Sequence, residues 1–341
     1  MKSINVLSLF NGMSTGHTAL DNVGIKVNKY YSSEIKPSAI KLTQHHYPKT
    51  IQLGDINNWE DWDIDWALID MVLSGSPCQD LSICGTRSGL EGERSGLFWV
   101  FVEILKTIQK INPNVLFLQE NVGSAPKKDI GIMSRALGIY PVRINSSLVT
   151  AQKRDRYYWT NIKTARDGIF GDVVTDISQP TDKKIMFKDI VTDGAVKVDK
   201  SVCLLERTIA SASYKDIYSD KAQKFLKNRE EKSMMSLIYV TTDKHGCLTE
   251  HYASGTYYKD KKSKKCQDYL KKRDKTVPGM VTLIHEGSLA RIVNKVEMCR
   301  LQGFPDDWCD ILKDVEAGSL LGDGWTLPII EHIFSFLVEK K

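Results

Sequence analysis

The 341-residue sequence has no hydrophobic run long enough to cross a membrane, so no contact with a membrane is expected. The chain passes from Met1 directly into the apolar segment Ile4 to Phe10. This segment is too short for a signal peptide and has the composition of a first β-strand. A cytoplasmic protein is therefore expected.

Cysteine is scarce, and its pattern excludes two common uses. The seven cysteines are scattered and odd in number, which suits a reducing compartment better than a disulfide framework. The spacings of His245, Cys247, His251 and Cys266 match no zinc pattern, so no metal site is expected. A P-loop is also absent, which favours a cofactor without phosphates. The net charge of +5 is small, so where the charges lie is more informative.

Three predicted strands each end beside residues that suit a small cofactor. The first leads into a turn at residues 10–16 and then a helix, an arrangement that cradles nucleotide-type cofactors. Glu34, about 20 residues further on, suits ribose hydroxyl groups. Asp55 lies in a third strand, Ile51 to Ile56, where it can accept from an exocyclic amine while Ile56 packs on a ring. The alternative is a turn that binds nothing and two surface carboxylates.

The stretch Leu73 to Ser82 organises the chain. It follows Ala67 to Leu73, a predicted buried strand, so Cys78 lies just past a strand end, where open α/β sheets carry their chemistry. Pro77 restrains the backbone before it, and the following amides can lower the pKa of the thiol. We interpret Cys78 as a nucleophile, with an inert buried thiol as the alternative. The glycine-rich loop 83–95 can close over a substrate or be a plain connector.

Further candidates follow the next strands, between helices predicted over 96–111 and 127–137. Glu120 ends the apolar strand Asn114 to Val122 and is a candidate proton donor, with helix capping as its alternative role. Arg154 and Arg156 lie between strands predicted over 142–149 and 156–161. Being two residues apart, they point the same way and can grip a base carbonyl or a phosphate.

From about residue 163 to 287 the chain is polar and irregular. Residues 259–275 are dense in Lys and Arg among tyrosines, which is typical of a nucleic-acid surface. A solvated lysine-rich loop is the alternative. A helix is predicted over 289–308 and another over 329–338.

Five motifs in order resemble those of the cytosine-C5 DNA methyltransferase family. They are Phe10-x-Gly12, Gly75-Ser76-Pro77-Cys78-Gln79, Glu120-Asn121-Val122, Gln152-x-Arg154-x-Arg156 and Arg300-Leu301-Gln302-Gly303-Phe304-Pro305. Some details resemble the animal de novo branch, whereas the compact length resembles bacterial or phage enzymes. The motifs cover both ends of the chain and leave its middle unmatched.

The resemblance implies an α/β, S-adenosylmethionine-dependent methyltransferase (Rossmann-like) fold. It has a mixed sheet with helices on both faces, plus a smaller, irregular, mainly β target-recognition domain. The implied division is a catalytic and cofactor-binding domain at 1–165, completed by 312–341, a target-recognition domain at 166–287 and a connecting helix or hinge at 288–311.

The implied activity is sequence-specific methylation of cytosine at C5, with the base flipped out of duplex DNA. Cys78 attacks C6, Glu120 holds N3, and Arg154 or Arg156 stabilises charge at O2. S-adenosyl-L-methionine is the implied methyl donor, with S-adenosyl-L-homocysteine as the product. The implied cofactor contacts are Phe10, Gly12, Ser14, Thr15, Gly16, Glu34, Ile35, Asp55, Ile56, Pro77, Leu97, Trp325 and Thr326. The implied DNA contacts are Gln79, Ser82, Arg87, Arg94, Gln152, Lys259, Lys261, Lys262, Lys264 and Lys265.

Two positions depart from the family pattern. Ser14-Thr15 stands where the family turn usually has a second glycine, and Asp323 stands where asparagine is common. A carboxylate at 323 would repel the carboxylate of the cofactor unless it points elsewhere.

The expected partner is duplex DNA, bound by a monomer in a bacterium or phage-infected host, in association with the nucleoid. A cognate restriction endonuclease is a candidate second partner. The alternatives are a transfer-RNA methyltransferase of the same architecture, a catalytically idle DNA-binding regulator and an unrelated cysteine hydrolase. The hydrolase is disfavoured because none of the 7 histidines lies in a motif-like setting.

Overall fold

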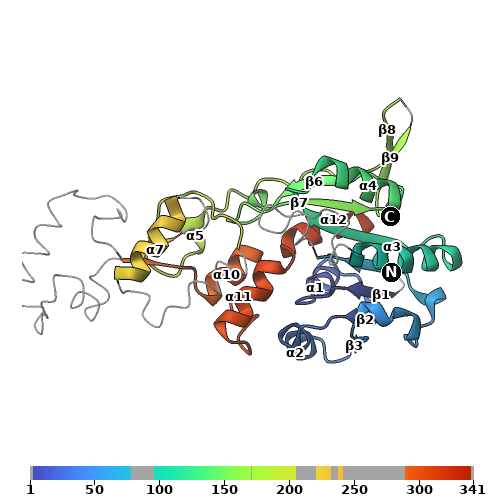
Figure 1. Ribbon diagram of the computed structural model, residues 1–341, viewed down its shortest axis with the longest axis horizontal. Helices are drawn as coiled ribbons and strands as arrows, with labels where there is room; N and C mark the ends of the chain where they lie inside the picture. Colours follow the sequence, from blue (N-terminus) through green and yellow to red (C-terminus); the bar gives the residue numbers. More distant parts are fainter. Residues whose placement is uncertain are drawn as a thin grey trace, which may run out of the picture.

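A seven-stranded sheet forms the centre of the computed structural model, which describes residues 3–77, 96–169, 171–204, 220–231, 237–240 and 289–338 (Figure 1). Its strands are β1 (Ile4–Leu9), β2 (Val27–Ser33), β3 (Ile51–Gln52), β4 (Met71–Ser74), β5 (Leu116–Val122), β6 (Val142–Asn145) and β7 (Asp155–Thr160). They lie in the order β3-β2-β1-β4-β5-β7-β6. The five strands from β3 to β5 are parallel and β7 is antiparallel to both its neighbours, which confirms the predicted mixed α/β sheet.

The strand order reverses at β1. The chain runs outward from β1 to β2 and β3, then returns to place β4 on the other side of β1. Such a reversal leaves a crevice beyond the carboxyl ends of the strands, where open α/β sheets bind their ligands.

Alternate residues of each strand pack on opposite faces of the sheet. Val6 and Leu73 belong to one buried core, and their neighbours Leu7 and Val72 belong to the other. The first core lies under α1 (Thr15–Asn22), α2 (Pro37–His46), α11 (Asp314–Asp323) and α12 (Leu327–Val338), and the second under α3 (Gly96–Ile111) and α4 (Lys127–Leu137). Helices therefore cover both faces, as the sequence predicts. α12 packs along α1, and Asn22 donates to Glu331 at 2.6 Å, so the two ends of the chain share one core.

The strands predicted over 67–73 and 142–149 are shorter in the structure, because the 3-10 turns η2 (Trp66–Leu68) and η4 (Ser146–Leu148) occupy part of each range. Two other predicted elements also differ from those observed. In place of one helix over 289–308, a short strand β12 (Leu289–Arg291) precedes α10 (Lys295–Gln302). Asn294 caps α10, exchanging hydrogen bonds with Glu297, and so sets its start. The predicted strand over 51–56 ends at Gln52, and a 3-10 turn η1 (Ile56–Asp61) begins where Asp55 accepts from the amide of Asn57.

A second, smaller assembly joins the sheet through α10. β10 (Ala195–Val196), β11 (Ile238–Val240) and β12 form a three-stranded antiparallel sheet, accompanied by α5 (Phe187–Ile190) and α7 (Asp220–Glu231). A hairpin of β8 (Thr164–Asp167) and β9 (Asp172–Thr175) projects from the main body (Figure 1). The loop 83–95 and the basic stretch 259–275 lie outside the described residues.

Within the described ranges, no helix combines the length and apolar character needed to cross a membrane. In the same part of the chain, no three His, Cys, Asp or Glu side chains are grouped to hold a metal ion.

His17 on α1 is stacked between two tyrosine rings behind the first turn. Its ring centroid lies 4.3 Å from that of Tyr30 and 3.8 Å from that of Tyr47. Its Nδ1 is buried and has no hydrogen-bond partner among the described residues. Burial lowers the pKa of His17 from 6.5 to about 4, because the cation would lose its hydration between the rings.

We predict that protonation of the unfolded chain at His17 destabilises the fold as the pH falls from about 6.5 to about 4. The unfolded histidine binds a proton through this window while the folded one stays neutral, so about 2 kcal/mol of stability is lost near pH 4.5. His17→Phe keeps the stacking and should reduce the pH dependence of the free energy of unfolding, measured by denaturant titration. An equal pH dependence in the variant and the parent protein would contradict this.

Candidate active site

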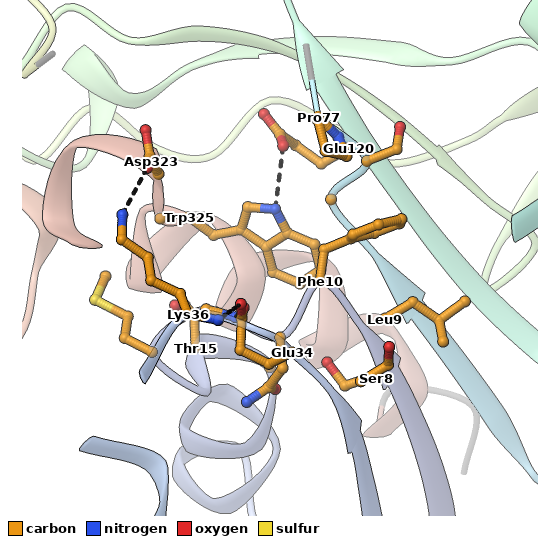
Figure 2. Close-up of a pocket in the computed structure, with 18 of the residues that line it drawn as sticks. Ser8, Leu9, Phe10, Thr15, Glu34, Lys36, Pro77, Glu120, Asp323 and Trp325 are labelled. Carbon is orange, nitrogen blue, oxygen red and sulfur yellow. Dashed lines mark hydrogen bonds and ion pairs between the residues drawn. The ribbon is translucent and has the colours of Figure 1, made fainter. Parts of the chain in front are cut away.

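A cavity of about 410 Å³ opens at the carboxyl edge of β1, β2 and β4, in the crevice where the strand order reverses (Figure 2). This volume is typical of small-molecule sites. The predicted cofactor residues that line it are Phe10, Gly12, Thr15, Gly16, Glu34, Ile35, Asp55, Ile56, Pro77, Leu97 and Trp325. Glu120, Arg154 and Arg156 line the same cavity, so the candidate cofactor and catalytic residues share one space.

The first turn depends on left-handed backbone at three residues. Phe10, Gly12 and Ser14 have φ of 56°, 56° and 60°. Glycine adopts this conformation readily, whereas serine needs compensation. The buried Ser14 Oγ accepts from Asn11 Nδ2 at 2.8 Å and lies 2.8 Å from Thr43 Oγ1. The Ser14 hydroxyl therefore stabilises the turn through Asn11 and Thr43, and its contact with a cofactor stays a prediction.

The carboxylate of Glu34 is fixed at the cavity wall by three backbone donors. Its Oε2 accepts from the amide of Gly12 at 2.8 Å, and its Oε1 accepts from the amides of Ile35 and Lys36 at 2.8 Å each. These bonds tie the end of β2 to the first turn. A carboxylate has about four lone-pair sites, so Glu34 retains acceptor capacity for ribose hydroxyls.

Asp323, which departs from the family motif, lies beside an ammonium group. Lys36 Nζ is 3.3 Å from Asp323 Oδ2 and donates to Ser319 Oγ at 2.6 Å. Lys36 and Asp323 both line the cavity, one beyond β2 and the other at the end of α11 (Figure 2). The positive charge of Lys36 therefore offsets the negative charge of Asp323, which by itself would repel the carboxylate of the cofactor. No motif marks Lys36, and its place two residues after Glu34 is its only local signal.

Glu120, near the end of β5, is held by two donors from distant parts of the chain. Its Oε1 lies 2.8 Å from Arg156 Nε, and its Oε2 accepts from Trp325 Nε1 at 3.1 Å (Figure 2). The side chains of Glu120 and Arg156 are only 11% and 13% exposed, so solvent screens their ion pair weakly. An acid, an arginine and an indole thus meet at one edge of the cavity.

The two motif arginines have different partners. Arg154 is buried, and its guanidinium donates to the carbonyl oxygens of Gly322 at 3.0 Å and Gly324 at 2.8 Å. It therefore holds the loop between α11 and α12. Arg156 instead contacts Glu120, so the geometry separates two residues whose roles the sequence leaves open.

Two further residues with predicted contacts have buried side chains, and their contacts with DNA or cofactor stay predictions. Gln152, predicted to touch DNA, is fully buried, and its amide contacts the carbonyl of Leu301 at 3.5 Å and the N–H of Leu204 at 3.4 Å. Thr326, predicted to touch the cofactor, donates to Gln302 Oε1 at 2.8 Å from a buried position.

The predicted nucleophile follows the last described residue of this strand–turn segment. The predicted residues Cys78, Gln79, Ser82, Arg87, Arg94, Lys259, Lys261, Lys262, Lys264 and Lys265 lie outside the described residues. Ser76 and Pro77 line the cavity, and Ser76 Oγ accepts from Gln119 Nε2 at 2.9 Å. Cys78 is therefore one residue from the cavity wall along the chain.

The cavity lies at the reversal point of an open α/β sheet, and Glu34 and the Glu120–Arg156 pair line it. This arrangement is typical of enzymes that use a nucleoside-type cofactor. The chain belongs to the C-5 cytosine-specific DNA methylase family, whose model matches residues 4–339. The resemblance drawn from five motifs is thereby confirmed. The family implies S-adenosylmethionine as the methyl donor, and a cavity lined by the carboxylates of Glu34 and Asp55 and by the apolar side chain of Ile56 fits a nucleoside-type group.

Known relatives include phage and bacterial enzymes. Orphan methyltransferase M.SPRI of Bacillus phage SPR is 28% identical over 244 residues, which are 68% of this chain and 51% of that protein. Type II methyltransferase M.NlaIV of Neisseria lactamica is 34% identical over 110 residues, 31% of this chain and 26% of that protein. The chain thus spans about half or less of the length of these relatives. The structure of Entamoeba histolytica methyltransferase EhMeth, 16% identical, matches 99% of both chains with a TM-score of 0.57, which confirms the fold.

We predict that Gly75→Ala displaces the indole of Trp325 from Glu120. A Cβ at residue 75 would lie 2.7 Å from Trp325 Nε1, and this indole is partly buried and packed against the core, so it cannot move without losing contacts. The free energy of unfolding should fall by about 1–3 kcal/mol, measured by thermal denaturation. Gly131→Ala on α4 is the control, since its Cβ would meet only the flexible end of Arg135 at 3.5 Å and should leave stability equal or higher. Equal stabilities of the Gly75 variant and the parent protein would contradict the prediction.

Proposed function

We propose that the protein is a DNA (cytosine-5-)-methyltransferase that transfers a methyl group to C5 of a cytosine flipped out of duplex DNA. The observation that carries the proposal is the cavity in which Glu120, with Arg156 and Trp325, faces the same space as Glu34. A site for a base and a site for a nucleoside-type cofactor adjoin there, directly before Cys78.

Cys78 makes C5 reactive, because C5 of cytosine is by itself a poor nucleophile. Its thiolate adds to C6, forming a sulfur–carbon bond and moving electron density to C5. C5 then takes the methyl group. Removal of the C5 proton and departure of the Cys78 sulfur from C6 leave 5-methylcytosine.

Glu120 holds N3 of the base and supplies the proton that ring nitrogen needs as charge develops. Arg156 and Trp325 orient its carboxylate, each through one oxygen. Of the two arginines, we assign stabilisation of charge at O2 to Arg156, because it lies beside Glu120. Arg154, which lines the same cavity, is assigned the separate role of holding the carbonyl groups of Gly322 and Gly324.

S-adenosylmethionine supplies a methyl group activated on a positively charged sulfur. Glu34 would accept from its ribose hydroxyls, and Asp55 and Ile56 would meet the adenine amine and ring. Lys36 balances Asp323 on the wall of the same cavity. These residues exclude water and orient the donor.

DNA is favoured over transfer RNA as the substrate. The family model that matches residues 4–339 is that of C-5 cytosine-specific DNA methylases, and M.SPRI and M.NlaIV are named as orphan and type II methyltransferases. The basic stretch at 259–275 is proposed to contact the backbone of the duplex, and the loop 83–95 to close over the flipped base. The enzyme is proposed to act as a cytoplasmic monomer on DNA, with a cognate restriction endonuclease as a candidate partner.

The first experiment tests the proposed reaction. Protein incubated with methyl-tritiated S-adenosylmethionine should label mixed-sequence duplex DNA as 5-methylcytosine, and Cys78→Ser should abolish the label because serine cannot supply a thiolate. Transfer RNA is incubated in parallel. Label in transfer RNA alone would show that RNA, not DNA, is the substrate. DNA binding without label would identify a catalytically idle regulator.

The charge balance in the cofactor site gives a second prediction. Lys36→Met removes the ammonium beside the carboxylate of Asp323, so the dissociation constant for S-adenosylmethionine should rise about fivefold. Adding Asp323→Asn should restore affinity to within about twofold, since it removes the repelling charge. Isothermal titration calorimetry measures both. Lys41→Met is the matched control, because Lys41 Nζ donates to the carbonyl of Ile311. Failure of the double variant to recover would contradict the charge argument.

A further inference from the structure

A short segment at residues 200–204 is bound tightly along the loop that precedes the motif arginines. The amide of Ser201 donates to the carbonyl of Ala151 at 2.7 Å, and the amide of Lys153 donates to the carbonyl of Ser201 at 2.7 Å. Lys200 Nζ donates to the carbonyl oxygens of Ser147 at 2.7 Å and Thr150 at 3.1 Å. These bonds fix the position of the next residues, among them Cys203.

The sulfur of Cys203 lies between the two motif arginines. It accepts from Arg154 Nη1 at 3.1 Å and from Arg156 Nη2 at 4.0 Å, and it lies 3.4 Å from the carbonyl of Leu204. Burial alone would raise the pKa of the Cys203 thiol, but the two guanidinium groups outweigh burial and lower it. The sulfur is thus an electron-rich acceptor shared by two cations.

From this sulfur a chain of contacts leads to the candidate proton donor. Arg156, which contacts Cys203, lies 2.8 Å from Glu120, and Glu120 accepts from Trp325. Arg154, which also contacts Cys203, holds the carbonyl oxygens of Gly322 and Gly324 just before Trp325. Both routes from Cys203 therefore end at the Glu120–Trp325 contact.

We propose that Cys203 is a positioning residue for the reaction, acting through Arg154 and Arg156 on Glu120; this rests on the function proposed above. Arg154 is buried, so loss of the sulfur would leave one of its N–H groups without an acceptor. The guanidinium would move to recover a partner, and the orientation of Glu120 and Trp325 would follow. A segment within the predicted target-recognition domain (166–287) thereby supplies a residue that positions the proposed catalytic groups.

Kinetics of two Cys203 variants test the proposal. Cys203→Ala should lower kcat for methyl transfer about tenfold and change the KM for S-adenosylmethionine less, because Glu34, Lys36 and Asp55 of the cavity wall lie outside this chain of contacts. Cys203→Ser keeps an acceptor and should recover most of kcat. Ser201→Ala is the control in the same segment, since the Ser201 hydroxyl donates to the neighbouring carbonyl of Val202, and this variant should match the parent protein. A Ser variant as slow as the Ala variant would overturn the proposal.

A spectroscopic signal separates this inference from the proposed function. In protein labelled with 5-fluorotryptophan, the fluorine resonance of Trp325 is assigned by its loss in Trp325→Phe. Cys203→Ala should shift that resonance, whereas Cys203→Ser and Ser201→Ala should leave it near its original position. If no nucleic acid is methylated, the proposed function fails, and this resonance alone decides the positioning role. An unshifted Trp325 resonance in Cys203→Ala would overturn the inference even in an active enzyme.

Discussion

The carboxylate of Glu120 is the contact on which the site depends. One oxygen binds Arg156 on β7 and the other binds Trp325 before α12, so three segments far apart in the chain meet at one side chain. A carboxylate with low exposure is costly unless donors surround it. The two donors therefore stabilise the packing of β7 and of the C-terminal loop against β5, and the same arrangement leaves an acid at the cavity edge.

The cofactor wall shows how departures from a motif are compensated. Ser14 takes a left-handed conformation that glycine would adopt without strain, and buried hydrogen bonds to Asn11 and Thr43 offset the cost. Asp323 places a negative charge on the cavity wall, and the ammonium group of Lys36, 3.3 Å away, balances it. In both cases a compensating residue lies outside the motif, Thr43 for Ser14 and Lys36 for Asp323, so a motif read alone underestimates what the site can tolerate.

The sequence predicts most of the strands and most of the residues that line the cavity, because apolar periodicity and polar residues at strand ends are local signals. It predicts α3 and α4 with the observed bounds. It does not predict that Gln152 and Thr326 are buried, because the polar character of a residue does not show whether its side chain faces the core or the cavity. It also misses Lys36 and Cys203, because their partners lie 287 and 49 residues away and only the fold brings them together.

The division of labour between Arg154 and Arg156 has a simple physical origin. Strand β7 begins at Asp155, so Arg154 precedes the strand and its side chain can turn back to the carbonyl groups of the C-terminal loop. Arg156 lies within β7 opposite Val122, at the carboxyl end of β5, which brings its guanidinium to Glu120. Residues two apart usually share a face of a strand, but this holds only while both lie in the strand. The boundary of β7 therefore separates a residue that holds the C-terminal loop from one that contacts Glu120.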